Sequence, residues 1–245
     1  MRIVWSKTPV IVLGITFAVA GARDAAAQSG FEGVVTYEIH GAKAPATMTI
    51  SSKGTKARME MSASQAPGGN MVILVDGTAN TRTVLIPTMK KYMVVPPSAG
   101  TGNAAEMPKY TATKTGKTET VAGEPCQVIH LTTVRAGKTE EGDACVGKGV
   151  GFNTQILDAL AGGRGSAMDA SMSSLRDAIG PGNGLLKMTT IKDGQPEVAV
   201  VATKIERTTV SDDQFVPPAG YTVMQMPNMG QMRQGAPGAP GAQPQ

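Results

Sequence analysis

The sequence is poor in the residues on which several classes of protein depend. Its 245 residues include two cysteines and two histidines, too few for a disulfide scaffold or for a zinc finger with normal ligand spacing. Aromatic residues make up 4% of the chain, too few for a platform on which single-stranded nucleic acid stacks. The formal net charge of +4 is spread along the chain, whereas nucleic-acid binding requires a concentrated basic face. We therefore expect no nucleic-acid partner.

Long apolar runs are also missing, apart from one near the N-terminus. There, Arg2 and Lys7 precede the apolar residues 8–20, and three alanines, Ala25–Ala27, precede Gln28. This order is typical of a secretory signal peptide over residues 1–27. The run is shorter than the ~20 residues that span a bilayer, and no cysteine near the cleavage site could carry a lipid. We expect an exported protein, periplasmic or secreted, that is soluble, is not a lipoprotein and has no transmembrane segment in its mature chain.

Glycine and proline, by contrast, are abundant, with 30 and 16 residues, and they separate short segments in which apolar and polar residues alternate. In the first of these, Phe31, Val35, Tyr37 and Ile39 share one face, which is typical of a half-buried strand. The segments expected as strands are residues 31–39, 47–51, 56–61, 71–75, 81–86, 91–95, 110–114, 118–121, 126–134, 138–146, 185–191 and 198–209. Short strands at this spacing predict a mainly β fold built on a curved antiparallel sheet.

One stretch breaks this pattern, because the apolar residues between 153 and 179 recur with helical spacing. Asn153 and Ser166 are candidate N-caps of two short helices, and Gly180 followed by Pro181 ends the second one. We expect this insertion, at about residues 153–180, to bury its apolar side chains against the open face of the sheet. The candidates for a lid and for the lining of a pocket beneath it are Ile156, Leu157, Leu160, Met168, Met172, Leu175 and Ile179.

The two cysteines, Cys126 and Cys145, lie in two segments that look like a hairpin about Ala136 and Gly137. A two-residue loop there places Cys145 opposite Val128, which makes Cys126 its diagonal neighbour on the same face. A bulge or a wider loop would bring the two cysteines directly opposite each other. Two cysteines in an exported chain most often form a structural disulfide. A redox pair, the alternative, requires close Cys-x-x-Cys spacing at a helix N-terminus, which is absent.

No constellation of catalytic residues is visible in the sequence. His40 and His130 have no acidic or cysteine partners at a readable spacing. Ser166 does not stand in a Gly-x-Ser-x-Gly motif. The glycine-rich residues 147–151 lack the Lys-Ser/Thr ending of a phosphate loop, and a flexible strand-to-helix connection is the better interpretation. We expect no enzyme and no cofactor.

Methionine is unusually frequent, with 15 residues against four phenylalanines, which favours a core and binding surfaces built on flexible thioethers. Four methionines cluster near the C-terminus, at Met224, Met226, Met229 and Met232. Thioethers are soft ligands, so this cluster is a candidate site for Cu(I) or silver. The surrounding residues 226–245 are rich in Gln, Gly, Pro and Ala, a composition that predicts a disordered tail.

Several short motifs resemble an exported bacterial family, the domain of unknown function 4412. They are Phe31–Tyr37, Lys90–Tyr92, Val121–Cys126 with the pairing of Cys126 to Cys145, and Phe215–Tyr221. The likeness spans about residues 31–223. That family is distantly similar to the outer-membrane lipoprotein carrier and its receptor (LolA/LolB-like), which implies a half-open, strongly curved antiparallel barrel with short helices lying across its mouth as a lid. The resemblance carries no established activity.

Together these observations predict one β-rich domain over residues 28–225 that binds or carries an apolar, lipid-like ligand between its curved sheet and a helical lid, without catalysis. The few aromatic residues argue against lipid carriage, although Met, Val, Ile and Leu can line such a cavity instead. Two other hypotheses remain: a metal-handling (Cu(I)) or stress protein of the envelope that uses the methionine-rich tail, and a purely structural envelope module with a protein partner.

Overall fold

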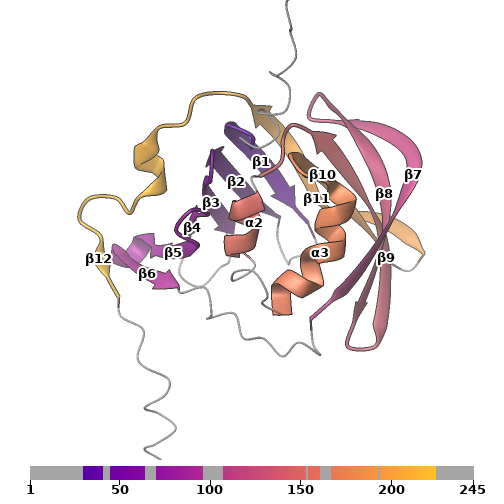
Figure 1. The fold of residues 1–245 in the computed structure, drawn as a ribbon, viewed down its shortest axis with the longest axis horizontal. Coiled ribbons are helices and arrows are strands. Elements are labelled where there is room, and N and C mark those ends of the chain that lie inside the picture. The colour runs from indigo at the N-terminus through magenta and orange to yellow at the C-terminus, as the bar shows by residue number, and fades with distance from the viewer. Residues whose placement is uncertain are drawn as a thin grey trace, which may run out of the picture.

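A computed structural model describes residues 30–40, 45–63, 70–95, 107–152, 154–160, 167–192 and 194–224. Twelve strands of this described part form one sheet, and two helices follow the ninth strand (Figure 1). The strands are β1 (Gly33–Ile39), β2 (Ala46–Lys53), β3 (Lys56–Ala63), β4 (Met71–Asp76), β5 (Thr81–Ile86), β6 (Lys91–Val95), β7 (Lys109–Val121), β8 (Glu124–Arg135), β9 (Lys138–Lys148), β10 (Asn183–Lys192), β11 (Gln195–Glu206) and β12 (Thr222–Val223). The helices are α2 (Thr154–Leu160) and α3 (Ala167–Ile179), with 3-10 turns η1 (Pro87–Met89) and η4 (Asp212–Phe215).

The sheet consists of two antiparallel meanders that are joined in the middle. Strands β1 to β6 follow one another in space, as do β7 to β11, and β1 pairs with β11. The two-residue strand β12 adds to β6 in parallel. The sheet therefore begins at β12 and ends at β7, and it does not close into a barrel. The predicted fold class, a mainly β curved sheet with a short helical insertion, is confirmed.

Irregularities in strand pairing bend the middle of this sheet. One lies after Thr36, where β1 pairs with β11, and two lie in β10, after Leu185 and after Met188. A bulge kinks its strand and increases the local twist. Because the three irregularities occur in neighbouring strands, the curvature of the sheet is concentrated around β1, β11 and β10.

Two-residue turns fix the register of the β7–β8–β9 hairpins. Arg135 pairs with Lys138, so Ala136 (φ 49°) and Gly137 (φ 77°) alone form the loop. Positive φ at both positions is typical of the type I′ turn that suits the twist of a hairpin. The sequence predicted two strands on either side of Gly116, but the structure has the single strand β7 with a break in register there. Gly116 has a φ of 75°, which lets one continuous strand absorb the irregularity.

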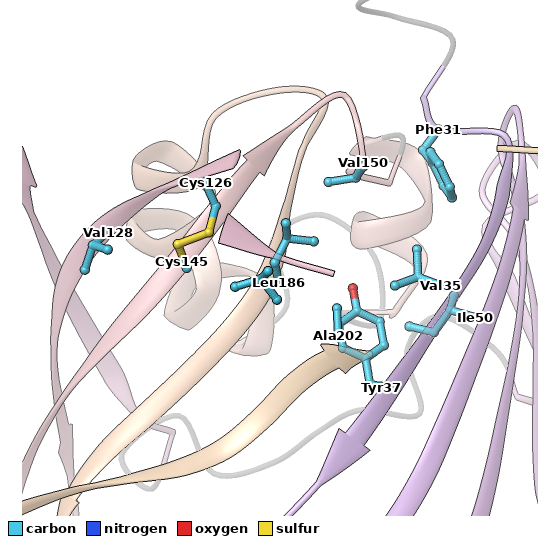
Figure 2. Packing of buried hydrophobic residues seen from close by; sticks show 11 residues of the cluster. Phe31, Val35, Tyr37, Ile50, Cys126, Val128, Cys145, Val150, Leu186 and Ala202 are labelled. Carbon is cyan, nitrogen blue, oxygen red and sulfur yellow. A yellow bond between two sulfur atoms is a disulfide. The ribbon is translucent and has the colours of Figure 1, made fainter. Parts of the chain in front are cut away.

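The predicted hairpin register and the disulfide are both confirmed. Val128 pairs with Cys145 and Cys126 pairs with Gly147, so the cysteines are diagonal neighbours, and a disulfide joins them with their Cα atoms 5.4 Å apart. Each cysteine is 3% exposed and belongs to the main core cluster, in which Leu186 is completely buried (Figure 2). The bridge therefore links two strands inside the core.

The helices α2 and α3 lie within the curve of the sheet (Figure 1) and pack on different strands. Ile156 of α2 is completely buried against Ala57 of β3 and Val75 of β4. On α3, Leu175 and Ile179 pack against buried side chains of β8 and β9. The Ser171 hydroxyl donates to the Pro108 carbonyl, and the Ser174 hydroxyl donates to the Tyr110 carbonyl at 2.5 Å. Each helix is thus attached to its own half of the sheet.

The segment after β11, residues 207–221, runs to β12 beside β6 (Figure 1) and covers the face of β3 to β5 that is turned away from α2. Arg58 Nη1 donates to the Gln214 carbonyl oxygen at 3.2 Å. Tyr221 packs on a buried cluster from β4 and β5, which comprises Val72, Leu74 and Leu85. Successive residues of a strand point to opposite faces, so Leu74 faces this segment while Val75 faces α2. Sequence analysis did not predict this covering segment.

Removing the disulfide is expected to destabilise the fold without changing it. The bridge closes a loop with a sequence separation of 19 residues, for which the restriction of the unfolded chain is worth about 3 kcal/mol. We expect the double variant Cys126→Ala/Cys145→Ala to lose about that free energy of unfolding in a urea titration. Reducing agent is the control, since it should destabilise the wild type and leave the variant unchanged. Equal midpoints for the oxidised wild type and the variant would contradict a stabilising role.

Candidate functional site

A cavity of about 790 Å³ lies between the helices and the bent middle of the sheet. Its floor consists of side chains from β1, β2 and β11: Tyr37, Met48, Ile50 and Val200. Leu185 at the start of β10, together with Val150 and Phe152 from the connection between β9 and α2, closes one end. Nine of the 20 lining residues are aliphatic or methionine and two are aromatic, in a chain that has few aromatic residues.

The helices form the opposite wall, and four of the seven predicted lid residues line the cavity. They are Leu157, Met172, Leu175 and Ile179. Ile156 and Leu160 do not line it, because they pack on the α2 core cluster with Ala57 and Val75. Successive helical residues point about 100° apart, so Ile156 and Leu157 face the sheet and the cavity, respectively. The side chain of Met168 and the candidate caps Asn153 and Ser166 lie outside the described residues.

Close backbone packing of glycines shapes one end of the cavity. A Cβ atom on Gly151 would lie 1.9 Å from the Asn183 carbonyl oxygen, and one on Gly184 would lie 2.4 Å from the Val150 carbonyl oxygen. Gly151 also donates its N–H to the Gly182 carbonyl at 3.2 Å. The glycine-rich stretch noted in the sequence is thus a strand-to-helix connection, and its last glycine permits close contact between two backbone segments.

An ion pair joins the two helices at the cavity wall. Arg176 of α3 contacts Asp158 of α2, with 2.6 Å between Nη1 and Oδ1, and the two side chains are 23% and 14% exposed. Just beyond, Gly180 donates its N–H to the Arg176 carbonyl at 2.8 Å, and the Asn183 side-chain amide donates to the Ile179 carbonyl at 2.8 Å. These bonds satisfy carbonyl groups that the end of a helix leaves without partners. Sequence reasoning did not identify the pair, because its members are 18 residues apart and lie on separate helices.

Tyr37 is the one residue of the cavity floor that carries a hydroxyl. Tyr37 is 6% exposed, and its hydroxyl donates to the Leu185 carbonyl oxygen at 3.0 Å. Figure 2 shows the side chain among the residues of the main core cluster. Burial raises the pKa of Tyr37 to about 12, because the apolar surroundings disfavour the phenolate. The hydroxyl therefore keeps its proton throughout the physiological pH range.

The other candidate residues from the sequence lie elsewhere. His130 contacts Asp143 at 2.9 Å, and His40 lies 3.6 Å from Glu38; neither histidine lines the cavity. No three His, Cys, Asp or Glu residues within the described ranges are grouped so that they could hold a metal ion.

The C-terminal methionine cluster is described only at its first member. Met224 donates its N–H to the Tyr92 carbonyl at 2.7 Å, next to the short strand β12. Met226, Met229 and Met232 lie outside the described residues, as does the rest of the predicted tail, residues 226–245. Copper binding by this cluster therefore stays a prediction.

Two observations bear on where the protein resides. Among the residues that the structure describes, neither α2, α3 nor any other helix has the length and apolar character needed to span a bilayer. The disulfide indicates a chain that folds in an oxidising compartment outside the cytoplasm. The predicted signal peptide, residues 1–27, lies outside the described residues and stays a prediction.

Comparison with known proteins gives one family and a set of distant structural neighbours. The family model "Domain of unknown function (DUF4412)" matches residues 31–221, nearly the range over which the sequence motifs resemble that family. No curated protein matches the sequence. Among solved structures, PNGF-II is 12% identical with a TM-score of 0.41 over 82% of this chain, and MucB is 13% identical with a TM-score of 0.36 over 80%. This chain spans 32% and 59% of their lengths, respectively.

The buried hydroxyl of Tyr37 predicts a specific loss of stability at high pH. Its pKa rises from 10.0 to about 12 on folding, so the folded state holds this proton more tightly than the unfolded chain. The resulting stabilisation is complete below pH 10 and is lost as the pH rises towards 12. At about 1.4 kcal/mol for each pKa unit, this loss amounts to roughly 2–3 kcal/mol.

The variant Tyr37→Phe isolates this contribution. At pH 7 it should be less stable than the wild type by ~1 kcal/mol, because the Leu185 carbonyl loses its donor. Above pH 10 the variant should lose less stability than the wild type, so the difference between them shrinks or reverses. Urea unfolding of both proteins between pH 7 and pH 12 measures this. If the free energies of unfolding of the two proteins differ by the same amount at every pH, Tyr37 has the same pKa in the folded and unfolded states and the prediction is wrong.

Proposed function

The chain belongs to the DUF4412 family, and from its cavity we propose that it is a non-enzymatic binding or carrier protein that shelters an apolar, lipid-like molecule outside the cytoplasm. The ligand lies between the curved sheet and the helices α2 and α3. The observation that carries this proposal is the apolar cavity of about 790 Å³ at that position.

The size and lining of the cavity favour a small apolar ligand. Binding sites for small molecules usually measure about 300–1,000 Å³ and combine apolar walls with a few polar groups that orient the ligand. The floor and the helical wall contain Met48, Ile50, Leu157 and Met172. Methionine adapts its shape to a flexible partner such as an acyl chain. The scarcity of aromatic residues, which argued against lipid carriage, is therefore compensated by aliphatic and thioether side chains at the cavity itself.

The polar groups of the cavity favour binding over catalysis. The Asp158 carboxylate is engaged by Arg176, and the Tyr37 hydroxyl is engaged by the Leu185 carbonyl. Both histidines of the chain and both cysteines are absent from the lining. Acid–base or nucleophilic catalysis requires such side chains within hydrogen-bond reach of each other and of the ligand.

Ligand carried through purification tests the proposal most directly. We expect protein purified from its native host, without detergent, to release an apolar molecule on extraction with organic solvent. Mass spectrometry of the extract should find it in near-stoichiometric amount in repeated preparations. A protein of similar size taken through the same steps is the control for lipid contamination. Repeated preparations without any enriched apolar molecule would lead us to abandon the proposal.

Narrowing the cavity should weaken binding while the fold persists. Leu157 lines the cavity and is not part of the buried α2 cluster, so Leu157→Trp should place its larger side chain in the ligand's space. We expect about a tenfold or greater loss of affinity for a neutral fluorescent apolar probe, since clashes of this kind cost at least 1–3 kcal/mol.

Met89→Trp is the matched control for this variant. It introduces the same residue at a position that is 54% exposed, on η1 and away from the cavity. This control should bind the probe as the wild type does. If the Leu157→Trp variant is folded and binds the probe with unchanged affinity, the probe occupies a site other than this cavity.

A further inference from the structure

We propose that the cavity selects an apolar molecule whose polar end carries a hydrogen-bond donor and no negative charge, such as a long-chain alcohol or amine, over the corresponding carboxylic acid. This inference rests on the proposed function, because it concerns the ligand of the same cavity. It follows from the hydrogen-bonding capacity and the charge of the few polar groups in the lining.

Tyr37 offers an incoming ligand only the acceptor side of its hydroxyl. A carbonyl oxygen can only accept a hydrogen bond, so the hydroxyl proton of Tyr37 is directed at the Leu185 carbonyl. The oxygen of a phenol can still accept a bond from a second donor. A ligand group that reaches this oxygen must therefore donate, as a hydroxyl or an amine does and a carboxylate does not.

The charged side chains of the lining disfavour an anion. They are Asp158, Asp177 and Arg176, so acidic groups outnumber basic ones. Asp177 is an exposed residue of α3, so its charge faces the solvent as well as any polar ligand end at the cavity. No lysine is among the residues that line the cavity.

Arg176 does not offset the repulsion of an anionic ligand by the acidic residues. Its charge is already neutralised by Asp158, whose Oδ1 lies 2.6 Å from Arg176 Nη1. An anionic ligand that took over Arg176 would leave the carboxylate of Asp158, which is 14% exposed, without its counter-charge. Removing one partner from a poorly hydrated ion pair is strongly unfavourable. Arg82, on β5, is directed at the Leu160 carbonyl at 3.2 Å and does not line the cavity.

A series of ligands that differ only in their polar end tests this inference. Hexadecanol, hexadecylamine and hexadecanoate share one apolar chain and compete with a neutral fluorescent probe for the purified protein, below their aggregation concentrations at pH 7. We expect the alcohol and the amine to displace the probe at concentrations about tenfold lower than the acid. One hydrogen bond together with the avoided repulsion accounts for a factor of that size.

Two variants assign the selectivity to the residues named. Asp177→Asn removes one negative charge at an exposed position and should bring the affinity for the acid severalfold closer to that for the alcohol. Asp213→Asn is its matched control, since it removes the same charge from η4, away from the cavity, and should leave the order of affinities unchanged. Tyr37→Phe should lower the affinity for the alcohol by about fivefold and leave the affinity for the acid unchanged.

The outcomes separate this inference from the proposed function. If the neutral probe does not bind at all, the proposed function fails, and the inference fails with it. If the probe binds and the acid displaces it as well as the alcohol and the amine do, the function stands and the inference is overturned. Equal effects of Asp177→Asn and Asp213→Asn on acid binding would likewise overturn the assignment of the selectivity to the cavity.

Discussion

The architecture depends on the pairing of β1 with β11. Within the residues that the structure describes, this pair alone joins the meander of β1–β6 to the meander of β7–β11. It brings together residues from the two ends of the described chain, such as Val35 and Ile205. Three of the strand irregularities lie in this pair, in the adjoining pair of β11 with β10 and in the next pair, of β10 with β9, so the sheet bends near the place where its halves meet. The bend places the two halves, and the helices attached to them, around a common space.

The cavity follows from this arrangement. α2 buries Ile156 and Ala159 against β3 and β4, whereas α3 buries Leu175 and Ile179 against β8 and β9. Two short helices held on separate halves do not fill the space between them, and the ion pair of Asp158 with Arg176 connects them across it. The main core cluster, which contains the disulfide, shares Tyr37, Ile50 and Val150 with the lining of the cavity. Lining side chains on the helical wall, such as Leu157 and Met172, lie outside this core, so they can vary with less effect on the residues that hold the sheet together.

The sequence predicted those parts of the structure that local patterns determine. Alternation over residues 31–39 located β1, and the two-residue loop at Ala136 and Gly137 gave the register that pairs Val128 with Cys145. The helical periodicity identified four side chains of the cavity wall, among them Leu157 and Met172.

Features that depend on distant residues were not predictable in this way. Tyr37 and Leu185 are 148 residues apart, and nothing in their neighbourhoods signals that a hydroxyl meets a carbonyl. The contact of Gly151 with Asn183 likewise appears only when β9 and β10 lie side by side. Periodicity placed Ile156 and Leu157 on one apolar face, but the shape of the sheet decided that the first is buried against it while the second lines the cavity.

An open sheet leaves two outer strands whose backbone groups could pair with another copy of the chain. The outer strand β7 is long, but it carries Lys109, Lys114 and Lys117 and is broken in register at Gly116. At the other end, β12 has only two residues and lies parallel to its neighbour. Lysines, bulges and very short outer strands are the means by which β proteins avoid edge-to-edge aggregation. The fold can therefore remain open around its cavity without offering a flat template on which further copies would polymerise.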